Sequence, residues 1–148
     1  KYIDGEYSSF APFTTVVFDS EDYDLGSDYN TSNGVFTAPT DGIYWFHFNL
    51  TMVSQLDNVI DFTIRLLSSN GESYAYATDI NEGQFEDSAT IEPHTFAVSA
   101  QIKLDSGQNV RAQYFSGTTH GDIDAESTHD GQTVNRITYF QGNLVRAL

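Results

Sequence analysis

The side chains best suited to chemistry gather in one polar segment, residues 120–130. It holds two imidazoles and four carboxylates within eleven positions. Both groups are metal ligands, and both hydrogen-bond polar ligands such as sugars. The segment lacks a specific metal-ligand spacing, so it predicts either a ligand-binding loop or a flexible polar loop. The ligand-binding candidates are His120, Asp122, Asp124, His129 and, ahead of the segment, Tyr114.

A second acidic segment offers oxygen ligands, because Asp22, Asp24 and Asp28 lie close together in the chain. Calcium is held by several oxygens, mostly carboxylates and backbone carbonyls. The segment is not an EF-hand, since Gly26 is out of place and no glutamate closes the loop. Two alternatives stay open for the acidic segments: a cation site, or a solvated surface that keeps the protein soluble.

No arrangement for nucleophilic catalysis is visible. The chain has no cysteine, and none of its serines lies in a nucleophile-elbow pattern. His47 falls on the mixed face of an apolar strand, where packing or an interface hydrogen bond is favoured over proton transfer. The sequence therefore predicts no catalytic residue and a protein that is not an enzyme.

The elements that position these residues are strands. Apolar residues recur at every second position, which is the period of a strand with one buried face. Asn70-Gly71 and Asp105–Gln108 supply the tight turns of two predicted β-hairpins. The pattern therefore indicates an all-β chain with strands over 43–53, 60–66, 73–78, 96–104 and 110–114.

The last strand is apolar on both faces. Ile137, Tyr139, Val145 and Ala147 are expected on one face, and Phe140, Gly142 and Leu144 on the other. A strand of this kind needs the core behind it and a second covering surface in front, most often another subunit.

One stretch combines a turn, a strand, a tight corner and an aromatic strand in a fixed order: Asp28-Tyr29-Asn30, then Gly34 to Phe46. With Val17-Phe18-Asp19 before it, and Lys103-Leu104, Gly107–Val110 and Tyr139–Leu144 after it, it resembles the globular C1q domain. The resemblance implies a C1q/TNF-like jelly-roll β-sandwich of about ten antiparallel strands. The residues that carry the motif are Phe18, Asn30, Gly34, Phe36, Pro39, Gly42, Tyr44, Phe46, Gly107, Phe140 and Gly142.

The resemblance also implies a homotrimer, formed through the outer face of the sheet that holds the aromatic and the closing strands. Trp45, His47 and Tyr139 are then the interface candidates. Some C1q-like trimers hold calcium, and counting back from Leu104 places that family's metal-binding aspartate on Asp87. The family's next ligand is an amide and is not reproduced near His94, so calcium is a cofactor expectation that rests on Asp87.

The length and net charge of the chain limit the kinds of partner that the protein is expected to bind. The 148 residues, 39% of them hydrophobic, predict a single domain over 1–148, with about 1–9 as a loosely ordered start. A net charge of -15 repels phosphate backbones, so nucleic acid is not an expected partner. No apolar run is long enough for a transmembrane helix, so no membrane insertion is expected.

The function that the resemblance implies is a secreted, lectin-like recognition module that binds carbohydrate or microbial surface molecules as a homotrimer. The alternative is a structural trimerisation head or a cytokine-like ligand for a protein receptor.

Overall fold

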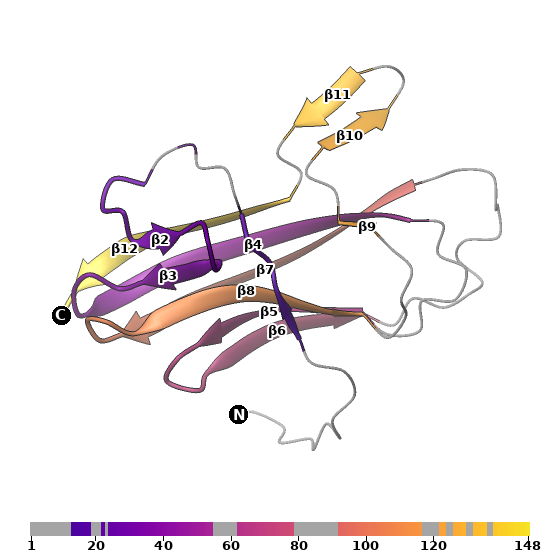
Figure 1. Cartoon of the computed structure of the whole chain (residues 1–148). Coiled ribbons are helices and arrows are strands. Elements are labelled where there is room, and N and C mark those ends of the chain that lie inside the picture. The colour runs from indigo at the N-terminus through magenta and orange to yellow at the C-terminus, as the bar shows by residue number, and fades with distance from the viewer. Residues whose placement is uncertain are drawn as a thin grey trace.

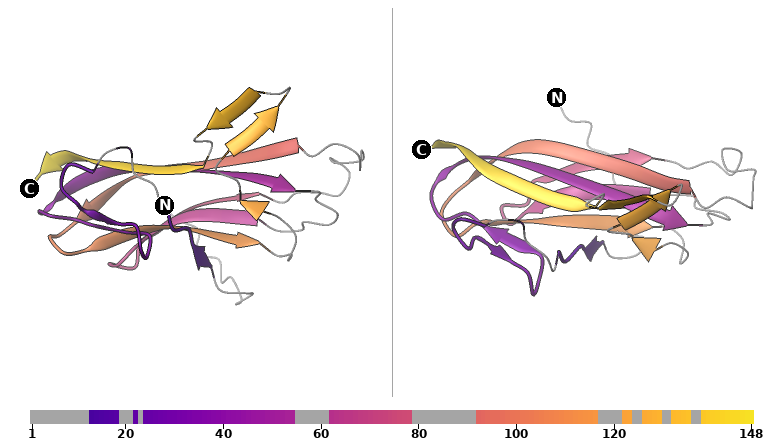
Figure 2. Two further views of the ribbon diagram at one scale, coloured as in Figure 1. Left: turned by 45° about the horizontal axis from the view of Figure 1, so that its top comes forward. Right: turned by 90° about the horizontal axis from the view of Figure 1, so that it is seen from above.

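The computed structural model describes residues 13–18, 22, 24–54, 62–78, 92–116, 122–123, 126–129, 132–135 and 138–148. Two antiparallel sheets stack as layers (Figures 1 and 2). The first sheet has the order β2 (Tyr29–Asn30), β3 (Val35–Thr37), β8 (Asn109–Ser116), β5 (Phe62–Ser68) and β6 (Ser73–Thr78), and β1 (Thr14–Thr15) also pairs with β8.

The second sheet places β4 (Gly42–Ser54) between β12 (Tyr139–Ala147) and β7 (Glu92–Leu104). The short strand β9 (Asp122–Ile123) adds to the far end of β4. A hairpin of β10 (Glu126–His129) and β11 (Gln132–Asn135) stands apart from the two layers in Figure 1. The expected all-β sandwich, a jelly roll, is confirmed. No helix among the described residues is long and apolar enough to span a membrane.

The core lies between the layers and follows the alternation of the strands. Every second residue from Tyr44 to Leu50 in β4 and from Phe62 to Ser68 in β5 points inward, and these side chains are almost completely shielded from solvent. Burying one large apolar side chain contributes roughly 1.5–3 kcal/mol to folding, so this set supplies most of the driving force. The core comprises Ala38, Tyr44, Phe46, Phe48, Leu50, Phe62, Ile64, Leu66, Phe96, Ala100, Ile102, Leu104, Val110 and Ala112.

The tight corner before β4 is tied to the turn between β7 and β8. Tyr44 donates its hydroxyl proton to the carbonyl of Thr40 over 2.7 Å. The Asp41 carboxylate accepts from the backbone N–H of Ser106 over 2.7 Å, and the N–H of Gly107 donates to the carbonyl of Ala38 over 2.8 Å. The corner and the β7–β8 turn therefore hold each other in place.

Glycines stand where the turns need a positive φ. Gly34 has φ +73°, and its N–H donates to the carbonyl of Asn30 over 2.9 Å. Gly71 and Gly107, in the two predicted hairpin turns, have φ of +91° and +85°. The predicted hairpin between β5 and β6 is therefore confirmed, and the strand over 73–78 has the predicted bounds. The second predicted hairpin is wrong, because the turn at 105–108 joins β7 to β8 and these two strands belong to different sheets.

One expectation about the last strand is wrong. Ala147 was expected on the same face as Tyr139, but it lies opposite Gly42, which lies on the inner side of β4. The reason is a β-bulge between Leu144 and Arg146, which inserts one residue and reverses the alternation beyond it. Leu144 and Val145 at the bulge are 45% and 51% exposed.

Candidate functional site

The outer face of the sheet β12–β4–β7 carries a cluster of rings, which we call the aromatic cluster: Trp45, His47 and Tyr139. The rings of Trp45 and His47 are nearly parallel, with centroids 5.9 Å apart and planes 11° apart. The Tyr139 ring lies 5.5 Å from that of His47. The structure therefore brings the three predicted interface residues together on one half-buried surface.

The cluster is fixed from the third strand by a hydrogen bond. His47 Nδ1 and Ser99 Oγ are 2.6 Å apart, and the tautomer of the ring decides which of them donates. Ser99 lies directly opposite His47 in the β4–β7 ladder, so this contact follows from the register. One imidazole edge is held by a hydroxyl, while the ring faces are left to aromatic neighbours.

Both ends of this outer face carry polar or charged side chains. At one end, the hydroxyl groups of Thr51 and Thr95 are hydrogen-bonded to each other over 2.9 Å. The backbone N–H of Thr51 donates to the hydroxyl of Thr138 over 3.0 Å. At the other end, Ile43 lies between Lys103 and Arg146. The aromatic cluster therefore sits between a threonine network and a pair of basic residues.

The inner side of the same strands is packed with aromatic rings. Phe46 and Phe140 stack with centroids 5.7 Å and planes 6° apart. Phe18 also stacks on Phe140, and their ring centroids are 6.2 Å apart. Phe36 meets both Tyr44 and Phe46 at 5.6 and 5.2 Å. The motif residues thus form the aromatic core that carries the outer face.

The predicted ligand-binding residues are placed less completely. Tyr114 packs against the core, with its ring 6.3 Å from that of Phe62. Asp122 begins β9 and His129 ends β10, where the backbone is described but the side chains are not. His120, Asp124 and the metal candidate Asp87 lie outside the described residues. The ligand-binding and calcium assignments therefore stay predictions.

The acidic segment 22–28 uses carboxylates to shape its own loop. Asp24 accepts from the N–H groups of Tyr29 over 2.9 Å and Gly26 over 3.2 Å. Burial raises the pKa of Asp24, but backbone N–H groups outweigh it and hold the pKa below its ordinary value. Burial, followed by the charge of Asp24, raises the pKa of Asp28. Across the described part of the chain, no three His, Asp or Glu residues gather as a metal site would require.

Comparison with known families decides the assignment. The family model of the C1q domain matches residues 5–134. The chain belongs to the C1q domain family. The match ends before β12. The resemblance of the closing strand to the family is therefore a separate observation in favour of the same assignment.

Two relatives agree with membership of the C1q domain family. Complement C1q tumor necrosis factor-related protein 3 of Mus musculus is 25% identical over 116 residues, which are 78% of this chain and 43% of that protein. The solved globular domain of zebrafish complement 1qA superposes with a TM-score of 0.61 at 18% identity, covering 90% of this chain and 86% of that one. The second likeness supports the fold alone. C1q domains are generally non-enzymatic, in agreement with the absence of a predicted catalytic residue.

Two sets of residues escaped the sequence analysis of this C1q domain. Ser99 was missed because alternation says which face it occupies but not which residue it opposes. Arg65, Gln113 and Arg111 form a second constellation, on the outer face of the other sheet. The sequence does contain a signal for this second constellation, because Arg65 and Arg111 occupy strands that have no acidic residue.

Proposed function

We propose that this protein is a secreted, non-enzymatic recognition module that works as a homotrimer and binds carbohydrate or microbial surface molecules. Family membership supports the class of function. The single observation that carries the proposal further is the aromatic cluster of Trp45, His47 and Tyr139 on the outer face of β4 and β12.

The aromatic cluster suits an interface between copies of this chain. Aromatic side chains are enriched in the buried centre of protein interfaces, where charged residues are depleted. Trp45, His47 and Tyr139 occupy the middle of the face, while Lys103 and Arg146 lie at one end. That is the arrangement of an apolar centre with a charged edge. Three copies that bury this face place three identical sets of loops around one axis.

Trimerisation matters for recognition because single sugar contacts are weak. Linking three sites can raise the apparent affinity by ~10² to 10⁴ when all engage one surface. The ligand-binding part of the proposal consists of the candidates His120, Asp122, Asp124, His129 and Tyr114, with calcium at Asp87. Calcium, if bound only by the folded state, raises the melting temperature.

The first test is the mass in solution of the wild-type protein and of Trp45→Glu. The wild type is expected near three times the chain mass of 16.5 kDa by light scattering. Trp45→Glu places a charge in the cluster and is expected to give a monomer with an unchanged fold by circular dichroism. Leu25→Glu is the matched control, because Leu25 is 99% exposed and lies away from β4. A wild-type mass near one chain contradicts the proposal.

The second half of the test is retention on immobilised neutral and acidic polysaccharides, with and without calcium. The wild type is expected to be retained, and Trp45→Glu to elute early because it loses avidity. A trimer that no polysaccharide retains in either condition refutes the lectin-like function and favours the structural head or receptor ligand.

A further inference from the structure

The six-stranded sheet has an unusual charge for this chain. The protein carries 21 acidic and 6 basic residues, yet β1, β2, β3, β5, β6 and β8 contain no aspartate or glutamate. The charged residues in these strands are Arg65 of β5 and Arg111 of β8. A third of the basic residues of a strongly acidic protein therefore belong to one sheet whose strands lack carboxylates.

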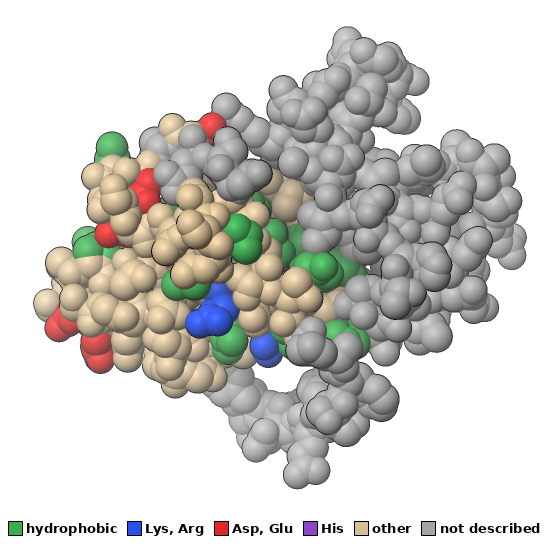
Figure 3. All heavy atoms as spheres, viewed as in Figure 1, with side chains coloured by type: hydrophobic (Ala, Val, Ile, Leu, Met, Phe, Trp, Pro, Cys, Tyr) green, Lys and Arg blue, Asp and Glu red, His purple; other side chains and the backbone are tan. Residues whose placement is uncertain are grey.

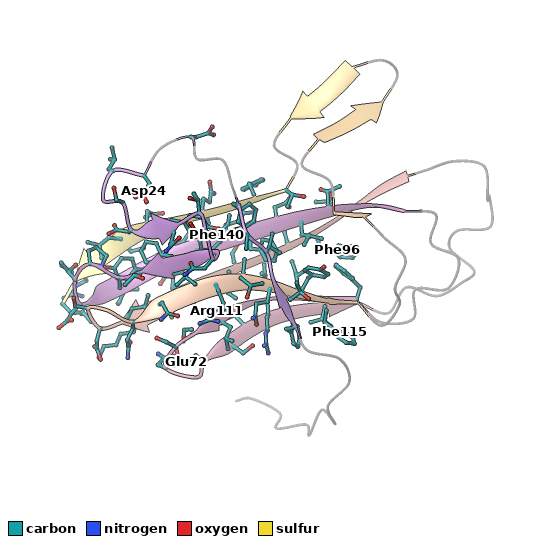
Figure 4. The ribbon with its side chains drawn as sticks, in the orientation of Figure 1. Asp24, Glu72, Phe96, Arg111, Phe115 and Phe140 are labelled. Carbon is teal, nitrogen blue, oxygen red and sulfur yellow. The ribbon has the colours of Figure 1, made fainter. Side chains whose placement is uncertain are left out.

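The two arginines are neighbours on the outer face of that sheet. Arg65 lies opposite Gln113, and Leu67 lies opposite Arg111, so the arginines occupy a diagonal pair of positions. Diagonal side chains on one face are within reach of each other when they are long. Figure 3 shows two Lys/Arg patches close together with no Asp/Glu colour between them, and Figure 4 labels Arg111 in this region.

Arg65 is held in a fixed position by uncharged groups. Its guanidinium carbon lies 3.6 Å from the centroid of the Phe13 ring, and its Nε donates to Gln113 Oε1 over 2.8 Å. Gln113 is only 7% exposed, and its Nε2 donates to the hydroxyl of Thr15 over 3.1 Å. Burial lowers the pKa of Arg65, which still leaves it charged at neutral pH. Among the described residues no hydrogen bond uses the terminal nitrogens of this guanidinium, so they can serve another partner.

Arg111 has apolar neighbours on both sides. It lies between Leu67 of β5 and Val35 of β3. Within the described residues neither guanidinium has a carboxylate partner. Two like charges at diagonal positions repel each other. Partial burial also makes each unpaired charge less favourable than it is in water. A bound anion would relieve both costs.

A further polar group lies beside this pair. Asn109 precedes Arg111 by two residues on β8 and so shares its face, and its Oδ1 is buried without a hydrogen-bond partner among the described residues. An orphaned buried amide calls for an explanation. Because the oxygen and nitrogen of an amide are interchangeable by a flip, the same side chain can present an N–H donor to a ligand.

We propose that Arg65 and Arg111 form an anion site for an acidic saccharide, on the sheet opposite the aromatic cluster. The proposal rests on the proposed function and specifies its ligand class. The planar forks of the arginines fit a carboxylate or a sulfate with two parallel hydrogen bonds. The Phe13 and Phe115 rings, 5.8 Å apart at the edge of the site, offer apolar surface for the carbon face of a sugar ring.

The experiment measures binding of alginate, which carries carboxylates, of dextran sulfate and of neutral dextran, at physiological salt. Wild-type protein is expected to bind one or both anionic polymers more tightly than dextran, and the two anionic arms tell carboxylate from sulfate. Arg111→Gln is expected to weaken anionic binding by about 10- to 100-fold, as for the loss of a charged hydrogen bond. Arg111→Lys keeps the charge but loses the fork, so it is expected to fall between the two.

The matched control is Lys1→Gln, which removes one positive charge from a residue that belongs to neither the arginine pair nor the proposed trimer face, and it is expected to leave anionic binding unchanged. The side chain of Arg111 makes no hydrogen bond within the described residues, so its variants are expected to keep the wild-type melting temperature. Equal anionic binding by wild type and Arg111→Gln overturns the site. Retention on neutral polysaccharide alone also overturns it but leaves the proposed function standing, whereas no retention on any polymer refutes both.

Discussion

At Gly142 there is no room for a side chain. A Cβ atom placed there would lie 2.6 Å from two carbons of the Phe46 ring. That ring is completely buried and stacks on Phe140. A single added methyl group at Gly142 therefore acts on the centre of the aromatic core, and not on the solvent side of β12.

Gly142→Ala is expected to lower the free energy of unfolding by about 1–3 kcal/mol, the usual cost of overpacking a core. Thermal or urea unfolding measures it. The matched test is a double-mutant cycle with Phe46→Leu, which removes the ring that the methyl group would meet. If steric conflict is the cause, the double variant costs less than the sum of the singles. Additive losses contradict this explanation.

At the scale of the element, β1 is short and depends on side chains to stay in place. It pairs with β8 through two residues, and the N–H of Val16 extends the ladder to the carbonyl of Ala112 over 2.9 Å. The other attachment is the hydrogen bond from the buried Gln113 amide to the Thr15 hydroxyl. Thr15 therefore does more for the attachment of β1 than its exposed neighbour Thr14.

Thr15→Val is expected to lower the free energy of unfolding by about 1–2 kcal/mol, because it leaves a buried amide donor unsatisfied. Thr14→Val makes the same change of shape at an exposed position and is expected to stay within about 0.5 kcal/mol of the wild type. Chemical denaturation compares the two, and limited proteolysis is expected to cut near β1 faster in Thr15→Val. Equal stabilities would show that the hydroxyl contact is unimportant.

Much of the element pattern could be predicted from the sequence. Alternation identified β4, β5, β7 and β8, and the Asn70-Gly71 turn identified β6 as the partner of β5 in a hairpin. The turn at 105–108 was also identified, but it connects the two sheets and does not form the predicted hairpin. Alternation cannot say which strands are neighbours, so the contact between His47 and Ser99 and the constellation around Arg65 were out of reach. The bulge at Val145 was also missed, since it depends on how β12 pairs with β4 and leaves no local signal.

At the scale of the whole molecule, the proposed trimer must overcome its own charge. Each chain has a net charge of -15, so three copies repel one another at a distance. The aromatic cluster of one copy attracts that of another through apolar and aromatic contacts, which salt does not weaken. Assembly is therefore governed by a short-range attraction against a long-range repulsion.

Raising the salt concentration from 0.01 to 0.15 M is expected to strengthen the trimer, because the screening length falls from about 30 Å to about 8 Å. Sedimentation over a range of protein concentrations at both salts gives the dissociation constants. Trp45→Glu, which adds one carboxylate per copy at the face, is expected to stay monomeric at both. A trimer that weakens with salt would mean that ion pairs hold the interface.

The position of β4 between β12 and β7 sets how the protein opens. Its backbone is bonded along both edges, and Phe46, Phe48 and Leu50 are fully buried beneath it. Its amide protons can therefore exchange with deuterated water only when the sandwich comes apart, whereas amides on an outer strand such as β6 exchange through local fraying. The rate of deuterium uptake at the amides of β4 therefore measures the free energy of global unfolding without added denaturant.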